Sequence, residues 1–357
     1  MRAVNGPVDV VDTHAEAAAL ALPPLVVRRP LEAWLDEQGL GRGALTVTRI
    51  GAGHSNATFL LEREGTRMVL RRAPRPPLPP SAHDMLREAL VLRALEGRAR
   101  VPRVLAVGHD DEVLGVPFYV MEELRGHIVT DELPASLGSP DARRWAGIDL
   151  VDALAELHAV DIASAGLADF GRPDGYLERQ VRRFAALWEH NATRELPLVA
   201  ELAAWLGDAL PRSAEACVVH GDYRLGNAML DLEQPRVLAL LDWELATLGD
   251  PLADLGYLVA TWSDAGSPQT VLDLSPVTRG EGFPSRAELV ARYAERSGRE
   301  VAGLAWYEVL ALWKAAVFCE GLYRRYLRGE TADPWTASLG NGVPGLLRAA
   351  AAAAGSA

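Results

Sequence analysis

The spacing of apolar residues divides the chain into a strand-rich first third and a helix-rich remainder. Short apolar runs between turn signals predict strands in the first third. These runs are 44–50, 57–62, 67–72, 103–107 and 117–121. Helical spacing of apolar residues predicts a short helix at 31–40 and a longer one at 82–95, with Ser81 as the candidate N-cap of the second. The first third is therefore expected to be a small antiparallel sheet with one inserted helix.

After about residue 125, helical spacing dominates the chain. Helices are predicted at 142–160, 176–190, 199–210, 252–262, 286–296, 305–327 and 335–354, and short strands at 216–219, 228–231 and 237–241. Strands followed by helices are typical of an α+β protein with two lobes. We therefore predict an N-terminal arm at 1–29, a nucleotide-binding first lobe at 30–125 and a mostly helical second lobe at 126–357.

The composition limits the classes of protein to which the chain can belong. Its 357 residues are 49% hydrophobic and 24% charged, which is ordinary for a folded protein. The net charge of −12 disfavours a nucleic-acid partner, because such partners usually require a basic surface. No apolar run approaches the roughly 18 residues of a membrane-spanning helix, so we expect no membrane segment.

The cysteines and the lysine content add to this picture. Cys217 and Cys319 stand in apolar surroundings without CxxC spacing, so we expect buried thiols in a soluble cytoplasmic protein. Among the 36 basic residues there is a single lysine, Lys314. Because Lys314 lies among apolar residues, we expect its amino group to extend to the surface.

The strongest functional pattern is the segment 218–227, with the sequence VVHGDYRLGN. An apolar strand ends at His220, and Asp222 and Asn227 follow before the next short strand. A further apolar strand leads directly to Asp242. These are hard oxygen ligands of the kind that Mg²⁺ prefers when it also binds phosphate oxygens. Phosphoryl transfer needs one carboxylate to orient a hydroxyl group and other oxygen ligands to hold magnesium, and the pattern supplies both.

This pattern resembles the catalytic loop of the aminoglycoside phosphotransferase and choline kinase family, whose members are related to protein kinases. The segment 241–258, LDWELATLGDPLADLGYL, is similar to the metal-binding segment of that family and the helix after it. The resemblance covers about residues 50 to 329. It implies a two-lobe kinase-like fold, ATP and Mg²⁺ as cofactors and a small hydroxylated acceptor. The LRR-x-P sequence and Ser81–Glu88 resemble the subgroup related to the kinase domain attached to some acyl-CoA dehydrogenases.

The resemblance also implies a role for each residue of the catalytic pattern. Asp222 would be the catalytic carboxylate, and Asn227 and Asp242 would hold Mg²⁺. His220 and Asp254 would support the loop structurally. Taken singly, a His-Gly-Asp sequence marks a turn and an Asp-Pro sequence a helix start, so the prediction depends on their joint order between these elements.

In the first lobe, the glycine-rich turn IGAGHSN separates two predicted strands. Glycines allow backbone N–H groups to approach phosphates. No Gly-Lys-Ser/Thr sequence follows, so this turn is not a Walker loop. It resembles the phosphate-covering hairpin of the family, which implies nucleotide contacts from Gly51, Gly53, Ser55 and Asn56. A plain hairpin turn is the alternative.

Arg71 occupies the position at which kinases place a strand lysine, and Glu88 is the candidate partner on the following helix. Arginine keeps the positive charge and can bind two phosphate oxygens, but it is bulkier than lysine and planar. The adjacent Arg72 is expected to point to the other face of the sheet. A surface salt bridge is the alternative interpretation of Arg71 and Glu88.

The strand at the end of the first lobe leads into the segment that the family uses to bind adenine. By resemblance, Met121 would pack behind the base, and the backbone from Glu122 to Leu124 would bind it. On the substrate side, Arg224 and Glu244 are candidates, because they adjoin the catalytic and metal positions.

These observations predict an ATP-dependent phosphotransferase that acts on a hydroxyl group of a small molecule, with a hydroxyacyl thioester or another hydroxy metabolite as candidate acceptor. An antibiotic kinase is the alternative within the same chemistry. A non-catalytic ATP-binding module is the alternative from another class, because the usual lysine is missing; the intact Asp222, Asn227 and Asp242 oppose it. A protein kinase is disfavoured, because the segment between Asp242 and Asp250 is too short to dock a peptide.

Overall fold

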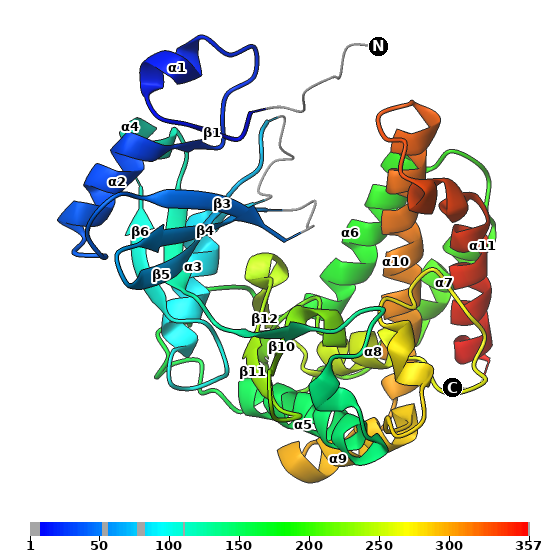
Figure 1. Ribbon diagram of the computed structural model, residues 1–357. Coiled ribbons are helices and arrows are strands. Elements are labelled where there is room, and N and C mark those ends of the chain that lie inside the picture. Colours follow the sequence, from blue (N-terminus) through cyan, green and yellow to red (C-terminus); the bar gives the residue numbers. More distant parts are fainter. Residues whose placement is uncertain (1–7, 52–55, 77–82, 110, 356–357) are drawn as a thin grey trace. The chain divides into compact units, whose positions relative to one another are not determined.

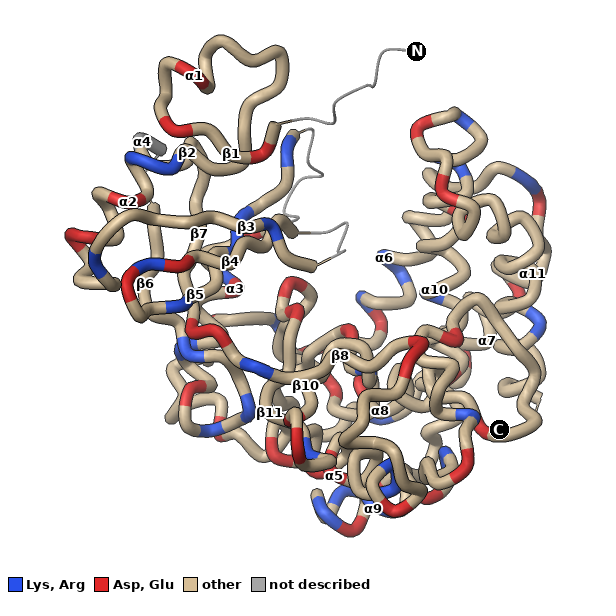
Figure 2. Tube along the Cα trace, in the orientation of Figure 1, with Lys and Arg blue, Asp and Glu red and all other residues tan. Residues whose placement is uncertain are grey.

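The computed structural model describes residues 8–51, 56–76, 83–109 and 111–355 (Figure 1). The chain forms two compact units. The first contains the described residues up to Glu96 together with Val101–Arg125, and the second contains Gly97–Arg100 and the described residues from Gly126 onward. Lys and Arg residues alternate with Asp and Glu residues along both units (Figure 2).

The first unit contains a five-stranded antiparallel sheet with the strand order β3-β4-β5-β7-β6. This confirms the predicted sheet. Its strands are β3 (Thr46–Ile50), β4 (Ala57–Arg63), β5 (Thr66–Arg72), β6 (Val104–Gly108) and β7 (Phe118–Glu122). The helices that accompany the sheet are α2 (Arg28–Glu37), α3 (Met85–Leu95) and α4 (Asp111–Leu114).

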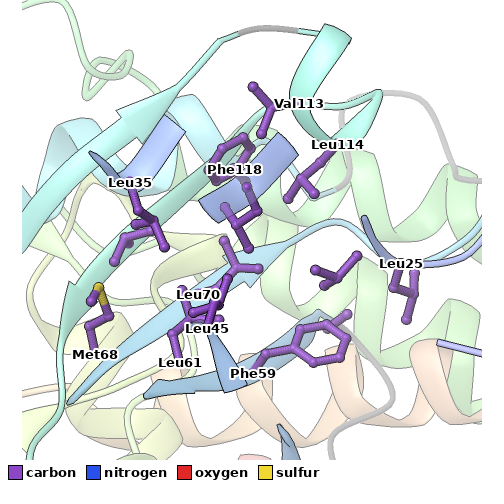
Figure 3. Packing of buried hydrophobic residues seen from close by; sticks show 14 residues of the cluster. Leu25, Leu35, Leu45, Phe59, Leu61, Met68, Leu70, Val113, Leu114 and Phe118 are labelled. Carbon is purple, nitrogen blue, oxygen red and sulfur yellow. The ribbon is translucent and has the colours of Figure 1, made fainter. Parts of the chain in front are cut away.

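Alternate residues of the strands form the core on one face of this sheet (Figure 3). Phe59 of β4 lies opposite Leu70 of β5, which lies opposite Val120 of β7, and all three are fully buried. Leu31 and Leu35 of α2 are buried in the same cluster. The period-two alternation of the strands therefore places one apolar face under α2 and leaves the other face for α3.

Helix α3 contacts β6 and β7 on that other face. It begins at Met85, and the carboxylate of Asp84 caps it by accepting the Arg87 N–H at 3.0 Å. The predicted cap, Ser81, lies outside the described residues, and the prediction that the helix begins at residue 82 is wrong. Asp84 is the preferred type of N-cap residue and stands immediately before the apolar spacing.

The residues before α2 add structure that the sequence did not predict. Strand β1 (Val10–Val11) pairs in parallel with β2 (Val26–Val27), and a short helix, α1 (His14–Ala18), lies between them. Arg72, on the core face of β5, donates hydrogen bonds to backbone carbonyl groups, including that of Leu25. Burial lowers the pKa of Arg72 to about 10. Arg72 therefore points to the face predicted for it and fastens the N-terminal segment to the sheet.

The second unit is mainly helical, as predicted. Its helices are α5 (Pro140–His158), α6 (Tyr176–Asn191), α7 (Leu198–Asp208), α8 (Leu252–Thr261), α9 (Arg286–Ser297), α10 (Leu304–Leu327) and α11 (Pro334–Ala354). Helix α10 contacts α6, α7, α8 and α11, so it forms the centre of this helical group. In the described part of the chain, no helix combines the length and apolar character needed to cross a membrane.

Two small antiparallel sheets position the loop between them. One has the order β11-β10-β8 and the other pairs β12 with β9. Their strands are β8 (Gly126–Ile128), β9 (Cys217–Val219), β10 (Ala228–Asp231), β11 (Val237–Leu240) and β12 (Thr247–Gly249). Strands β9, β10 and β11 were predicted, whereas β8 and β12, with the sequences GHI and TLG, contain too few apolar residues to show a strand pattern. The loop between β9 and β10 is therefore held at both ends by hydrogen-bonded strands.

Candidate active site

The loop from His220 to Asn227 carries most of the predicted catalytic residues. Asp254 of α8 fixes its beginning: Oδ2 accepts the His220 N–H at 2.7 Å, and Oδ1 accepts the Gly221 N–H at 2.8 Å. Gly221 has a φ of +86°, and a Cβ at this position would lie 2.7 Å from the carbonyl oxygen of Leu245. Both the dihedral angle and the close approach therefore require glycine here.

His220 is buried within this loop and uses both ring nitrogens. Its Nε2 donates to the carbonyl oxygen of Leu241 at 2.8 Å, and its Nδ1 accepts the Asp222 N–H at 3.3 Å. The imidazole ring also lies 4.8 Å from the ring of Trp243. Since both nitrogens are hydrogen-bonded to backbone groups, His220 braces the loop.

Asp222 extends from the loop with 22% of its side chain exposed. Asn227 Nδ2 donates to Asp222 Oδ2 at 2.6 Å, and Arg224 Nε lies 3.5 Å from Asp222 Oδ1. The hydroxyl group of Tyr257, on α8, is close enough to donate a hydrogen bond to this carboxylate. Burial, followed by the negative charge of Asp222 and this hydrogen bond, raises the pKa of Tyr257 well above its ordinary value. Tyr257 is therefore protonated and donates to Asp222.

Asp242 follows β11 and lies next to Asn227 along the paired strands, because the Leu241 N–H donates to the carbonyl oxygen of Asn227 at 2.8 Å. Asp242 has a φ of +66°, which is uncommon for a residue other than glycine and is often found at functional sites. The amide nitrogen of Asn227 donates hydrogen bonds to Asp222. The amide oxygen of Asn227 is therefore available for a ligand.

The donor set of Asn227 and Asp242 fits Mg²⁺, because both offer hard oxygen atoms. Among the described residues there is no group of three or more His, Cys, Asp or Glu side chains that could hold a metal ion. A set of one carboxylate and one amide oxygen is too small to enclose an ion alone. It suits an ion that takes its remaining ligands from phosphate and water.

A pocket of roughly 330 Å³ opens beside Asp222 and is lined by residues of the second unit. Arg224 and Glu244, the candidates for the substrate side, both line it. Most of the remaining lining is apolar or aromatic, and it includes three exposed side chains: Leu245 (57%), Phe318 (57%) and Trp335 (40%). Exposed apolar side chains grouped around one pocket are typical of ligand binding.

Lys314 also lines this pocket, so the expectation that its amino group extends to the outer surface is wrong. Its Nζ donates to Gln180 Oε1 at 2.9 Å and lies 4.8 Å from the ring centroid of Phe184. Both partners belong to α6, which packs against α10. The packing of these two helices, and not the composition around Lys314, directs the side chain inward.

The two cysteines are free and buried, as predicted. Burial is the main cause that raises the pKa of Cys217 well above its ordinary value. Burial, aided by the charge of Glu320, raises the pKa of Cys319 to about 12. Neither thiol is therefore poised as a nucleophile.

Asp254 lies at the end of a buried hydrogen-bonded chain. His158 Nε2 lies 3.3 Å from Asp254 Oδ2, and His158 Nδ1 lies 2.7 Å from the hydroxyl group of Tyr293. Burial acts to raise the pKa of Asp254, but the hydrogen bond and charge of His158, the charge of His220 and the Gly221 N–H outweigh it and hold this pKa below its ordinary value. Asp254 is therefore an ionised structural carboxylate.

In the first unit, Arg71 and Glu88 form the predicted pair, with Arg71 Nη2 at 3.1 Å from Glu88 Oε1. Their side chains are only 12% and 1% exposed, which contradicts the surface-salt-bridge alternative. Asn56 joins this cluster: its Nδ2 lies 3.5 Å from Glu88 Oε2, and its Oδ1 lies 2.8 Å from His83 Nδ1. The structure thus brings together three of the residues predicted to contact nucleotide.

The other residues predicted to contact phosphate lie in the glycine-rich turn. Gly51 follows β3 with a φ of +78°, a conformation that favours glycine. Gly53 and Ser55 lie outside the described residues.

The predicted adenine-binding segment begins at the end of β7. Met121 lies opposite Val69 of β5 and is partly buried. The Glu122 N–H donates to the carbonyl oxygen of Arg103 at 2.9 Å, so this donor is used within the sheet. A backbone donor for adenine must therefore come from a later residue of the predicted segment, Glu123 or Leu124.

Three residues at the site were not predicted from the sequence. Tyr257 stands almost one helical turn after Asp254, so the amphipathic spacing of α8 was a signal that could have identified it. His158 and Lys314 carry no such signal. Each reaches the site through contacts between helices that are far apart in the sequence.

The sequence comparisons agree with this geometry. The model of the phosphotransferase enzyme family matches residues 46–318, which is more than half of the chain. The chain belongs to this family. Acyl-CoA dehydrogenase family member 11 of Rattus norvegicus is 36% identical over 315 residues, which cover 85% of this chain and 40% of that protein. The chain therefore spans less than half of the length of this relative.

Solved structures of phosphotransferases share the fold. A protein from Ralstonia eutropha, described as a candidate aminoglycoside phosphotransferase, is 30% identical with a TM-score of 0.80, covering 92% of this chain and 98% of that one. A GDP complex of aminoglycoside 2'-phosphotransferase-IIIa is 16% identical with a TM-score of 0.59, covering 91% and 98% of the two chains. The second likeness concerns the fold alone. The chain therefore has the kinase-like fold of these phosphotransferases.

Proposed function

We propose that this chain transfers the γ-phosphate of ATP to a hydroxyl group of a small molecule and that Asp222 is the catalytic carboxylate. The observation that carries the proposal is the position of Asp222. It lies at the edge of the apolar pocket, and Asn227, Arg224 and Tyr257 surround its carboxylate. A carboxylate that accepts a hydrogen bond from Asn227 and is paired with Arg224 keeps one orientation toward a hydroxyl group in that pocket.

In the proposed reaction, Asp222 accepts a hydrogen bond from the acceptor hydroxyl group and orients its oxygen toward the γ-phosphorus atom. The bond between that oxygen and phosphorus forms while the bond to the bridging oxygen of ADP breaks, and the hydroxyl proton passes to Asp222. Asn227 and Asp242 would hold Mg²⁺. When bound, the ion would neutralise negative charge on the phosphates. Asp254 and His220 keep the loop in place throughout.

Arg71 is the proposed substitute for the kinase lysine. Its guanidinium group is oriented by the buried carboxylate of Glu88. An oriented guanidinium group can bind two phosphate oxygens at once. Gly51, Gly53, Ser55 and Asn56 are proposed to add phosphate contacts. Met121 is proposed to pack behind adenine, and the backbone from Glu122 to Leu124, apart from the Glu122 N–H, to bind it.

The acceptor that we propose is a small hydroxylated metabolite, with hydroxyacyl thioesters among its candidates. This follows the similarity to the acyl-CoA dehydrogenase relatives, and the apolar lining of the pocket supports it. The antibiotic-kinase alternative is less well supported. The lining carries the cations Arg224 and Lys314 together with the carboxylates of Asp222, Glu244 and Asp254, so no strongly acidic surface favours a polycationic aminoglycoside.

The test compares the wild-type protein with Asp222→Asn and with Asp208→Asn, a control at an exposed carboxylate at the end of α7. ADP formation is measured with Mg²⁺, ATP and a panel of hydroxy acids, hydroxyacyl thioesters, diols and aminoglycosides. Asp222→Asn should lower kcat by roughly a hundredfold to ten-thousandfold, because general-base catalysis contributes that much. Wild-type turnover by Asp222→Asn would disprove the role of Asp222. If wild-type protein consumes ATP with none of these acceptors, the non-catalytic module is the better description.

A further inference from the structure

The proposed reaction gives no role to Lys314, a charged residue of the pocket. Lys314 is the single lysine of the chain, and its side chain projects from α10 into the pocket that also reaches Asp222. Its two contacts, Gln180 and Phe184, stand one turn apart on α6 and therefore on the same face of that helix. The ammonium group is thus held at a defined position in the pocket wall.

The ammonium group of Lys314 has more N–H donors than the acceptors it contacts. An ammonium group has three N–H donors. Within the described ranges of the chain, Gln180 Oε1 is the one hydrogen-bond acceptor of Lys314, and the ring of Phe184 takes up part of the charge from one side. Donors therefore remain for an acceptor atom of a bound molecule.

A lysine at this position also destabilises the fold. Burial lowers the pKa of Lys314 to about 8, with a further lowering by Arg183, while Asp254 and Asp222 act in the opposite direction. Below this pH the pocket holds a charge that water would solvate better. A methionine of similar length would avoid this cost, and destabilising residues retained at a site commonly serve function.

We propose that Lys314, held in place by Gln180, binds an oxygen atom of the phosphate acceptor, in a carboxylate or a carbonyl group, while the apolar wall around Leu310 and Phe318 binds its carbon chain. This inference rests on the proposed function for the identification of the pocket as the acceptor site. Lys314 thereby selects, among hydroxylated molecules, those that carry a second oxygen function on an apolar chain.

The two oxygen functions differ in their response to pH. A carboxylate binds the ammonium form of Lys314, so its affinity should fall as pH rises through about 8. A carbonyl oxygen needs only an N–H donor, which the neutral amine also supplies, so its affinity should change little. The other titratable groups of the pocket are Tyr176, Asp222, Arg224, Glu244, Asp254, Tyr257, Tyr307 and Cys319. Because these groups could also titrate, the pH dependence of affinity is assigned to Lys314 by comparing the wild type with Lys314→Met.

The experiment measures binding by titration calorimetry with three probes of equal chain length: ω-hydroxyhexanoate, its methyl ester and hexanediol. Wild-type protein should bind the hydroxy acid, the ester or both about tenfold more tightly than the diol, since a hydrogen bond to a charged donor contributes that much. Lys314→Met should bind all three equally and lose the pH dependence. Arg325→Met is the matched control, because Arg325 is an exposed cation on the same helix outside the pocket lining.

A second variant protects the test against a folding defect. Lys314→Gln keeps an N–H donor and should retain binding of the ester while losing the preference for the carboxylate. Thermal unfolding of Lys314→Met should occur at the wild-type temperature or above it, which a purely structural lysine would not allow. The inference is overturned if the diol binds as tightly as the other probes, if no probe binds, or if Lys314→Met keeps the wild-type preference.

These binding measurements do not depend on turnover. If the Asp222→Asn comparison disproves phosphoryl transfer but the lysine-dependent preference persists, the proposed function is wrong and the oxygen-binding role of Lys314 stands. If turnover depends on Asp222 and Lys314→Met binds every probe as the wild type does, only the inference about Lys314 fails.

Discussion

Asp254 Oδ2 accepts the backbone N–H of His220 at 2.7 Å, so a residue of α8 fixes the start of the catalytic loop. The same carboxylate also binds the Gly221 N–H and His158. A buried carboxylate with three donors is strongly constrained in direction. The orientation of Asp222, two residues further on, therefore depends on a helix that follows it in the sequence.

Asp254→Asn should destabilise the protein. The amide offers one acceptor oxygen where the carboxylate offers two, so one buried backbone N–H loses its partner. We expect the free energy of unfolding to fall by about 1–3 kcal/mol, measured by urea denaturation. Asp208→Asn is the control and should change little. If Asp254→Asn unfolds with the wild-type free energy, the contacts of Asp254 with the loop do not contribute to stability.

The depressed pKa of Asp254 predicts an acid-sensitive fold. Its ordinary value is 3.8, and the folded value is lower. The stability that this group contributes is therefore complete above the unfolded pKa and is lost as pH falls through the lower folded pKa. The wild-type stability curve should decline more steeply than that of Asp254→Asn below about pH 4. Parallel curves in this range would contradict the assignment of an ionised Asp254.

Arg71→Ala should raise the KM for ATP by roughly tenfold to a hundredfold, because a charge-assisted hydrogen bond contributes about 1.5–3 kcal/mol. Arg71→Lys should retain part of the affinity, since the charge remains while the two-point contact is lost. Arg93→Ala, at an exposed position on α3, is the control. An unchanged KM for ATP in Arg71→Ala would remove Arg71 from the nucleotide site.

Tyr257→Phe should lower kcat by about tenfold, because Asp222 loses one neutral hydrogen-bond donor. The KM for ATP should not change, which separates this positioning role from a general loss of structure. Tyr326→Phe, on α10 and outside the pocket lining, is the matched control. If both variants retain the wild-type kcat, Tyr257 does not orient Asp222.

Asp242→Asn should raise the Mg²⁺ concentration needed for half-maximal activity and leave the melting temperature near that of the wild type. Asparagine tolerates the left-handed conformation that Asp242 adopts, so the backbone should be preserved. Removal of divalent cations with EDTA should abolish turnover. Unaltered Mg²⁺ dependence of Asp242→Asn would place the metal ion on other ligands.

Most of the fold was predictable because its elements carry local patterns. Phe59 and Leu61 are two positions apart in β4, so both lie on the core face. Gly221 stands where the backbone adopts a positive φ, which other residues adopt with difficulty. The pairing of Arg71 with Glu88 was predicted from the resemblance to kinases, in which a strand lysine pairs with a glutamate of the following helix. The start of α3 was predicted three residues too early, because Asp84, which caps the helix, stands inside the range assigned to it.

The sequence by itself determined the order of strands and helices and the grouping of His220, Asp222, Asn227 and Asp242 around two short strands. Only the tertiary structure decided how the pocket is completed, because Lys314 meets Gln180 across 134 positions of the chain. Local periodicity indicates which face of a helix is buried, but not what that face meets. The packing of α10 against α6 and α8 therefore directs Lys314, which was expected at the surface, into the pocket that Asp222 also lines.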